Sequence, residues 1–363
     1  MLKRLVVSHR LQSSWKHTVI SLTTLGSLGP SLRASGVEVH ALGWCFGFRG
    51  VIEAFKLVAL IRKLAPDITQ TWMYHADFAG GIAARLAGRS RVIWGVRTTD
   101  LFSGSSRLTA FIRWACARLS ELIPDAIVFA ADASRQRHIS FGYSADRMVV
   151  IPNGFDLQRL QATIVERDAL RHHCGWAADT LVVGCLARFS HDKDLRNFVD
   201  AAGLVAQQFP SARFLMVGRN LDENNAELCD WIAKAGASER FAILGERSDV
   251  AICLAAMDVF AMSSRTEGFP NVVGEAMAMY LPCVVTDVGD AALLLGNCGV
   301  VVPKEDSAAL ADGIAQLLAL EADERRALGI AAHARIEHEF SMARCTQRFE
   351  ALYEEVVRAK GHK

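Results

Sequence analysis

The hydrophobic positions of the chain follow two alternating periods. Short runs rich in Val, Ile and other apolar residues are followed by longer stretches in which apolar residues recur every three or four positions. The short runs predict β-strands and the longer stretches predict amphipathic helices. The expected strands are 17–22, 37–42, 67–72, 91–96, 126–130 and 148–152 in the first half, and 180–187, 212–218, 240–245, 258–264, 282–287 and 299–303 in the second.

This alternation predicts parallel sheets. Strands separated by helices of ten or more residues imply right-handed βαβ crossovers, in which consecutive strands run the same way. A chain of 363 residues is too long for one ordinary core. The turn residues Pro152, Asn153 and Gly154 mark a boundary, followed by a polar helical connection to about residue 178 that could act as a hinge. We therefore predict an α/β protein with two doubly wound, Rossmann-like domains facing a cleft, residues 1–154 and 155–340.

Composition narrows the class of protein. Hydrophobic residues make up 51% of the chain and charged residues 22%, which is typical of a globular protein with a large core and not of a disordered one. No apolar run reaches the roughly 18 residues that a membrane-spanning helix needs. The nine cysteines include no CxxC pair, so the sequence indicates neither a zinc site nor a redox motif.

The charge is distributed unevenly. Residues 1–150 carry 19 Lys and Arg against 9 Asp and Glu, a net charge of +10, although the whole chain has only +1. This asymmetry predicts that the first half meets an anionic surface, either an anionic membrane leaflet or a phosphorylated substrate, with an ordinary solvated surface as the alternative. Nucleic acid is not expected, because no basic run is interleaved with aromatic residues. The candidate membrane contacts are Arg107, Arg113, Arg118, Phe111 and Trp114.

The stretch "SSRTEGFPNVVGEAMA" holds two glutamates, Glu267 and Glu275, on either side of a turn. It is expected to be a loop that leads into a helix, with Pro270 in the first turn. A helix N-terminus offers free backbone N–H groups for a phosphate, Gly268 allows close approach, and Glu275 could accept hydrogen bonds from the two hydroxyls of a ribose. The pattern suits a nucleotide-sugar. The alternative is a capping Glu267 and a solvated Glu275.

A second group of residues carries positive charge. Arg188 follows the strand 180–187, and Lys193 stands where the next helix begins. A lysine opposes the dipole at a helix N-terminus, which favours a functional reason for its presence. Both cations could neutralise a diphosphate; two ordinary surface cations are the alternative. No GxGxxG follows a strand and no GxxxxGK[ST] occurs, so dinucleotide and P-loop sites are not supported.

Together these segments resemble glycosyltransferase family 4, whose members are retaining enzymes of the GT-B fold. The resemblance rests on Arg188 with Lys193, the glutamate pair with seven residues between, "VVIPNGFD", "PCVVTDVGD" and the final "FSMARCTQRFEALYEEV". It implies that residues 341–363 form a helix crossing back to the first domain. It also implies that the natural protein begins about 15–25 residues further upstream, because the family's first strand and glycine-rich loop are missing before "MLKRLVVSH".

The resemblance implies a role for individual residues. Arg188, Lys193 and Glu267 would be catalytic, the two cations holding the donor diphosphate. The donor would also be bound by Gly268, Phe269, Pro270, Asn271, Val272 and Glu275, the last at the ribose. Arg97 stands roughly where relatives have a histidine, and His75 is a second cleft candidate. The base is expected near 218–219, with Arg219, and near 244–250. No metal and no other cofactor are expected.

We therefore predict a metal-independent, retaining hexosyltransferase. It would move a sugar from a UDP- or GDP-sugar to a glycan or lipid-linked acceptor in cell-surface polysaccharide synthesis. It would be cytoplasmic, with peripheral contact to the inner face of the membrane. The alternatives are a nucleotide-sugar-binding relative with little or no turnover, and an epimerase of the same fold.

Overall fold

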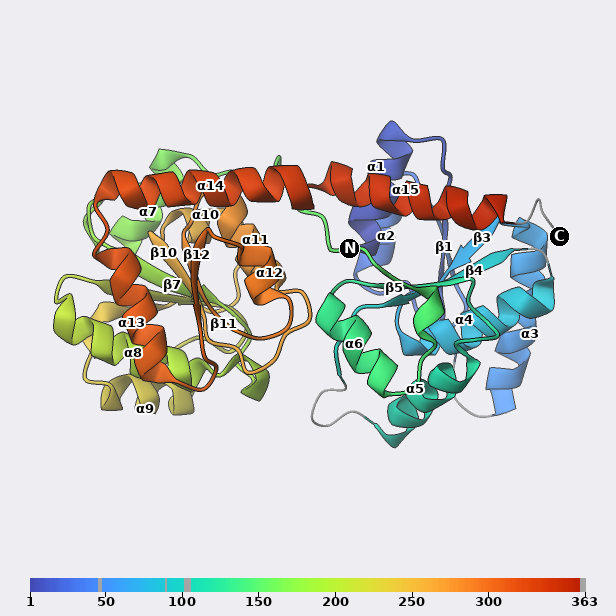
Figure 1. The fold of residues 1–363 in the computed structure, drawn as a ribbon, viewed down its shortest axis with the longest axis horizontal. Helices are drawn as coiled ribbons and strands as arrows, with labels where there is room; N and C mark the ends of the chain where they lie inside the picture. The colour runs from blue at the N-terminus through green and yellow to red at the C-terminus, as the bar shows by residue number, and fades with distance from the viewer. Residues whose placement is uncertain (45–47, 89, 101–105, 360–363) are drawn as a thin grey trace. The chain divides into compact units, whose positions relative to one another are not determined.

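The computed structural model describes residues 1–44, 48–88, 90–100 and 106–359, which form two compact units (Figure 1). Unit 1 comprises Met1–Gly154 and Met342–Lys363, and unit 2 comprises Phe155–Ser341. Ser341, which the family resemblance assigned to the C-terminal segment, falls in unit 2. No described helix is both long enough and apolar enough to span a bilayer.

Unit 1 contains six strands and seven α-helices among its described residues. The strands are β1 (Thr18–Ser21), β2 (Glu38–Ala41), β3 (Ile68–Gln70), β4 (Arg91–Val96), β5 (Ala126–Phe129) and β6 (Met148–Val150). The helices are α1 (Leu2–Gln12), α2 (Leu28–Ala34), α3 (Phe48–Leu64), α4 (Tyr74–Ala87), α5 (Arg107–Leu119), α6 (Asp132–Ser140) and α15 (Met342–Arg358).

The strands of unit 1 form two parallel sheets. β1 pairs with β2, and the other four follow the order β3-β4-β5-β6. Apolar residues of α3, α4 and α5 cover one face of the four-stranded sheet, on which Trp94 and Phe129 are fully buried. Residues of α1 and α15 cover the other face, where Ile93 of β4 and Phe349 of α15 are fully buried. Both faces are therefore covered by helices, as a parallel sheet requires.

Unit 2 has one parallel sheet of six strands. They are β7 (Val182–Leu186), β8 (Arg213–Val217), β9 (Phe241–Ile243), β10 (Val259–Met262), β11 (Cys283–Thr286) and β12 (Gly299–Val302), in the order β12-β11-β10-β7-β8-β9. The helices are α7 (Ile164–His173), α8 (Leu195–Gln208), α9 (Ala226–Lys234), α10 (Val250–Ala255), α11 (Asn271–Ala278), α12 (Ala291–Leu295), α13 (Ser307–Leu318) and α14 (Ala322–Phe340).

The predicted strands agree with the structure, since each expected range contains an observed parallel strand. The predicted fold class, α/β with parallel sheets in two domains, is confirmed. The segment up to residue 178, which we expected to be a polar connection between the domains, is instead part of unit 2. Its helix α7 packs against α10, and Arg171 is 1% exposed and forms an ion pair with Asp258 at 2.8 Å. This segment is thus anchored in the core of unit 2.

Candidate functional site

The candidate site of unit 2 lies where the strand order reverses. After β7 the chain proceeds to β8 and β9 on one side, and then returns to β10, β11 and β12 on the other. The loops that leave β7 and β10 therefore diverge at the carboxyl edge of the sheet, which is the place where open α/β sheets bind ligands. The loop after β7 carries Arg188 and Lys193, and the loop after β10 carries Glu267.

The loop after β7 is held in a fixed shape. It contains a 3₁₀ turn, His191–Lys193, and then Asp194, which has a φ of 44°. Arg265 secures this left-handed residue through two contacts of its guanidinium, at 3.0 and 3.1 Å, to the buried Asp194 carboxylate. Burial raises the pKa of the Asp194 carboxyl above its ordinary value, against the lowering effect of Arg265. The contact fixes the turn next to Lys193.

Lys193 and Glu267 come together although 74 positions separate them in the chain. The ammonium group contacts Glu267 Oε1, which also accepts a hydrogen bond from Ser264 Oγ at 2.8 Å. Ser263 Oγ donates to the backbone carbonyl of Lys193 at 2.9 Å. The end of β10 and the loop after β7 are therefore joined by both charge and hydrogen bonds. Both charged side chains are mostly buried, 20% and 11% exposed, so water screens their interaction only partly.

Helix α11 directs its N-terminus to the same edge. The helix begins at Asn271, with Pro270 in the N-cap position, so the expectation that Pro270 lies within the first turn was wrong by one residue. The N-cap residue Pro270 makes no side-chain capping hydrogen bond, and the first turn of the helix contains no acidic residue. The first N–H groups of a helix have no partner within the helix, and its N-terminus carries positive partial charge. Asn271 is exposed and Val272 is half-buried, so a ligand could reach this turn.

The remaining predicted donor residues lie on α11 or in the loop just before it. Glu275 is half-buried on the second turn of the helix. Phe269 is buried and stacks on Phe155, with 6.2 Å between ring centroids. Gly274 allows this packing, because a Cβ there would collide with the Phe155 ring. Phe269 therefore supports the loop from within the unit, and its side chain is not part of the accessible surface.

Gly289 is a site residue that sequence reasoning did not identify. It has a φ of +58°, and a Cβ at this position would lie 2.5 Å from the carbonyl oxygens of both Glu267 and Gly268. The following residue, Asp290, donates its backbone N–H to the Gly268 carbonyl at 2.9 Å. The loop after β11 thus packs directly against the loop that carries Glu267. The only signal in the sequence was the glycine of "PCVVTDVGD".

The expected base-binding region lies at the ends of β7, β8 and β9. Gly218 has a φ of +143° and donates its N–H to the Gly245 carbonyl at 2.8 Å. A Cβ on Gly218 would collide with the Ala187 carbonyl, so only glycine fits. Arg219 is 68% exposed and contacts Glu246 at 3.4 Å, while Arg188 is 50% exposed and contacts Asp192 at 3.7 Å. Both arginines lie at the same carboxyl edge.

The candidates in unit 1, His75 and Arg97, lie at the carboxyl edge of the four-stranded sheet. His75 is half-buried at the second position of α4. Arg97 follows β4, and its guanidinium lies over the Trp72 ring at 4.5 Å and donates to Asn153 Oδ1 at 3.2 Å. Its Nε and Nη2 atoms have no hydrogen-bond partner among the described residues. Burial lowers the pKa of Arg97 to about 10, so the side chain is still a cation at neutral pH.

A buried carboxyl near this edge is not indicated by the sequence. Asp77 accepts hydrogen bonds from Thr71 Oγ1 at 2.5 Å and from the Gly95 N–H at 3.3 Å. Burial raises the pKa of its carboxyl to about 7. An aspartate in the first turn of a helix is typical of a solvated cap, and nothing in the local pattern of the sequence indicates that it is enclosed.

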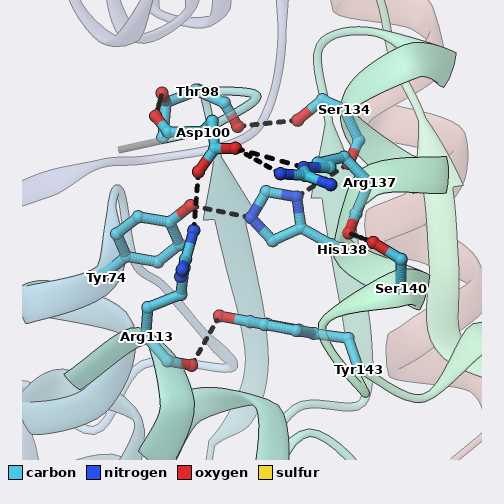
Figure 2. A network of polar contacts seen from close by, with 9 residues as sticks. All are labelled: Tyr74, Thr98, Asp100, Arg113, Ser134, Arg137, His138, Ser140 and Tyr143. Atoms are coloured by element: carbon cyan, nitrogen blue, oxygen red, sulfur yellow. Dashed lines mark hydrogen bonds and ion pairs between the residues drawn. The ribbon is translucent and has the colours of Figure 1, made fainter. Parts of the chain in front are cut away.

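Figure 2 shows the polar network around Thr98 and Asp100, which follow β4. Asp100 contacts Arg113 and Arg137, each at 2.8 Å, and Ser134 Oγ donates to the Thr98 carbonyl at 2.7 Å. The buried His138 receives the Tyr74 hydroxyl at 2.7 Å on Nε2, since its Nδ1 faces the Ser134 carbonyl. Burial lowers the pKa of His138 to about 4, so it is neutral at physiological pH.

This network corrects one prediction. Arg113 is a predicted membrane contact, but in the structure it is only 20% exposed. Besides its ion pair with Asp100, its guanidinium lies 3.9 Å from the centroid of the Phe141 ring. Arg113 is therefore a structural cation of unit 1. Among the described residues, no group of three or more His, Cys, Asp or Glu side chains is arranged to hold a metal ion.

Comparison with known proteins yields two family matches that together cover most of the chain. Residues 7–159 match Glycosyltransferase Family 4, and residues 180–320 match Glycosyl transferases group 1. The capsular polysaccharide biosynthesis glycosyltransferase CapM of Staphylococcus aureus is 22% identical over 84% of this chain and 81% of that protein. The lipopolysaccharide core biosynthesis mannosyltransferase LpsB of Rhizobium meliloti is 30% identical over 58% of this chain and 61% of its own length.

Solved structures share the architecture. Anabaena HepE, crystallised with UDP and glucose, superposes with a TM-score of 0.81 over 98% of this chain and 95% of that one, at 23% identity. Sucrose-phosphate synthase of Thermosynechococcus elongatus superposes with a TM-score of 0.77, at 18% identity and with 99% and 93% of the chains covered. Likeness at this identity establishes the fold, which is the GT-B fold that the sequence predicted.

Proposed function

Because this chain belongs to glycosyltransferase family 4, we propose that it transfers a hexose from a nucleotide-sugar, a UDP- or GDP-sugar, to a glycan or lipid-linked acceptor. The proposed setting is the synthesis of a cell-surface polysaccharide. Similar proteins support this setting, since CapM is named for capsular polysaccharide biosynthesis and LpsB for the lipopolysaccharide core. HepE, which has the same fold, was crystallised with UDP and glucose.

One observation carries the proposal. The Lys193–Glu267 pair lies beside the N-terminus of α11, with Val272 of its first turn lining the same hollow, at the position where the strand order reverses. A lysine ammonium, an arginine 50% exposed on the same loop and a helix N-terminus all favour negative charge. Glu267 holds Lys193 in place and offers a carboxylate to a sugar hydroxyl. This combination suits a sugar attached to a diphosphate.

The proposed reaction retains the anomeric configuration. The bond from the sugar C1 to the diphosphate oxygen breaks, and the acceptor oxygen forms its bond to C1 on the same face. The acceptor proton passes to the departing phosphate oxygen. Arg188, Lys193 and the α11 N–H groups would stabilise the charge that develops on the diphosphate, which is where preorganised donors lower the barrier most. In this proposal the two cations do this without a metal ion.

A donor panel tests the proposal. Thermal unfolding is measured with UDP-, GDP- and ADP-sugars, since a ligand that binds the folded state raises the melting temperature by mass action. The donor that stabilises the protein is then incubated with extracted glycans and lipid-linked sugars, and released nucleotide is measured with and without EDTA. We expect one donor class to stabilise the protein and to be turned over in EDTA. Absence of stabilisation by every donor contradicts the proposed function, and strict dependence on a divalent ion contradicts the metal-free reaction.

A further inference from the structure

Unit 2 also has a hollow at the edge of its sheet that lies opposite to the proposed donor site. The volume of this hollow is about 590 Å³, within the range of sites that bind small ligands. Its lining includes Asp258 and Pro282, the residues immediately before β10 and β11, so it lies at the amino edge of the sheet. The proposed donor residues follow β7 and β10, at the carboxyl edge. The hollow is therefore separate from the donor site.

The lining of the hollow combines buried apolar residues with exposed polar ones. The buried apolar residues are Met257, Leu281 and Pro282, and the exposed residues are Gln161, Tyr280 and Arg326. Two charged residues of the lining already have partners within unit 2. Asp258 forms its ion pair with Arg171, and Arg325 donates to the Leu320 carbonyl at 2.8 Å. An apolar base with a few polar groups around it is typical of a site for a small organic ligand.

Tyr280 occupies a backbone position that favours glycine. It follows α11 with a φ of 63° and donates its N–H to the Met277 carbonyl, while Leu281 donates to the Ala276 carbonyl, both at 3.1 Å. These two bonds form a Schellman motif, in which the left-handed residue is usually glycine. Among the described residues other than glycine that have a positive φ, Tyr280 is the only aromatic one. A large side chain kept in a strained conformation indicates a role for that side chain.

The Tyr280 ring is held in a fixed position although it is 53% exposed. It stacks on the His333 ring, with 3.9 Å between centroids and 6° between the planes. His333 Nδ1 in turn donates to the Ala278 carbonyl at 2.7 Å. Helix α14, which carries His333, packs on α11 so closely that a Cβ on Gly329 would lie 2.0 Å from the Tyr280 carbonyl oxygen (Figure 1). The ring is thus a preorganised flat surface beside the hollow.

The helix ends at the hollow favour a neutral ligand over a phosphate. Met279, in the lining, follows the last residue of α11, and a helix C-terminus carries negative partial charge. Ala322, also in the lining, is the first residue of α14, but Glu321 and Glu324 form a capping box at that helix N-terminus. The positive end of α14 is therefore already occupied by carboxylates. A ligand rich in hydroxyl groups suits these surroundings better than an anion does.

We propose that this hollow binds a hexopyranose unit of a neutral glycan. The C–H groups on one face of a pyranose ring form a flat apolar surface that can pack on the Tyr280 ring. The sugar hydroxyls can both donate and accept, and so can bond the Gln161 amide and the Arg326 guanidinium. The site would hold a glycan chain without taking part in the transfer. That this glycan is the polysaccharide under synthesis rests on the proposed function, whereas the binding of a pyranose does not.

The test uses the full chain and four neutral oligosaccharides, maltohexaose, isomaltohexaose, mannohexaose and galactohexaose. Saturation-transfer NMR detects binding, and calorimetry measures the affinity. We expect at least one oligosaccharide to bind the wild type. Tyr280→Gly should weaken that binding by at least about tenfold, because it removes an aromatic anchor, whereas Tyr280→Phe should keep it within about threefold. Binding of none of the four oligosaccharides, or wild-type affinity of Tyr280→Gly, would overturn the inference.

Thermal unfolding separates a binding role of Tyr280 from a packing role. Tyr280→Gly should have a melting temperature no lower than that of the wild type, because glycine adopts the left-handed conformation without steric cost. If this variant is nevertheless less stable, Gln161→Ala decides, since it changes an exposed loop residue. It should keep the wild-type melting temperature and weaken binding by at least about threefold. Wild-type affinity of Gln161→Ala would then overturn the inference.

A matched control comes from unit 1. Trp114 is 54% exposed, so Trp114→Ala removes an equally accessible aromatic ring that lies outside the hollow. This variant should bind the oligosaccharide like the wild type. An equal loss of binding would show that exposed aromatic rings bind the sugar without specificity, and would overturn the inference.

Nucleotide-sugar stabilisation separates this inference from the proposed function. Tyr280→Gly should keep the donor-induced thermal shift of the wild type, because Tyr280 lies at the opposite edge of the sheet from the donor residues. A wild type that binds an oligosaccharide through Tyr280 but is stabilised by no nucleotide-sugar would contradict the proposed function and leave the glycan site standing. A wild type that turns over donor but binds none of the four oligosaccharides would contradict the glycan site alone.

Discussion

Glu275 is the residue from which the proposed donor site can be tested most directly. It is half-buried on α11, behind the N-terminus that would hold the diphosphate. If its carboxylate accepts both ribose hydroxyls, Glu275→Ala leaves those hydroxyls without their partner, a loss of up to a few kcal/mol. We expect the donor Kd, measured by calorimetry, to rise by roughly one to two orders of magnitude.

The control for this experiment is Glu227→Ala, which removes an exposed glutamate from the first turn of α9. Its donor affinity should equal that of the wild type. A Glu275→Ala variant that also binds donor normally would disprove the ribose role, whatever happens to turnover.

Asp77 predicts a pH dependence of stability. Its carboxyl has a pKa of about 7 in the folded state, raised by burial from an ordinary value of 3.8. Between these two values the folded state keeps a proton that the unfolded chain has lost. The stability that Asp77 contributes is therefore fully present below about pH 4 and is lost as the pH rises towards 7.

Asp77→Asn should remove this dependence, because the amide cannot ionise and its oxygen can still accept from Thr71 and Gly95. We expect the variant to be more stable than the wild type at about pH 8, by on the order of 1 kcal/mol or more, and of similar stability at about pH 4. Thermal unfolding across this pH range measures the difference. A constant difference between the two proteins would show that Asp77 does not titrate in this window.

At the scale of elements, the loop after β11 shapes the site through Gly289. A residue other than glycine at this position would adopt the unfavourable left-handed backbone conformation, which costs about 1 kcal/mol. Its Cβ would also lie 2.5 Å from the carbonyl oxygens of Glu267 and Gly268. Gly289→Ala should therefore lower both the free energy of unfolding and the donor affinity.

Gly236 offers a matched control for this substitution. Its φ is +69°, but nothing lies within 4 Å of the position that a Cβ would occupy. Gly236→Ala should incur only the backbone penalty and keep normal donor binding. If the two alanine variants are equally stable in denaturant titrations and bind donor equally well, the packing of Gly289 against the Glu267 loop is not important.

At the scale of the whole molecule, the last helix in the chain completes the core of the first unit. Phe349 of α15 is fully buried in a cluster with Leu5 of α1, Ile93 of β4 and Val128 of β5. Truncating a buried phenylalanine generally costs about 3–5 kcal/mol. Phe349→Ala should therefore destabilise unit 1, whereas Phe55→Ala, at a position 72% exposed in the same unit, should change stability little.

The measurement is denaturant unfolding followed by hydrogen exchange, which reports the two units separately. Exchange should speed up in the strands of unit 1 for Phe349→Ala, and the donor-induced thermal shift attributed to unit 2 should persist. Uniform destabilisation of both units would contradict this division of the core.

The local pattern of the sequence was sufficient to predict the helices, the strands and the fold class. Strands such as β7 and β10 are recognisable as short apolar runs between turns, and α8 as a helix with one apolar face, because burial on a sheet or under a helix imposes a period on neighbouring residues. The alternation of strands and helices along the chain then limits the topology to parallel sheets. The glutamate pair and Arg188 with Lys193 were also recognisable, since each motif lies within a few consecutive residues.

What the tertiary structure decided were the partners of these residues. Lys193 meets Glu267 across 74 positions, Gly289 supports the Glu267 loop from another strand, and Arg113 is paired with Asp100. Asp77 is enclosed although its local sequence suggests a solvated cap. A residue's period in the chain reports which face of its own element it occupies. Which side chain lies opposite that face depends on how distant elements pack, and so burial, ion pairing and shifted pKa values arise only in the folded molecule.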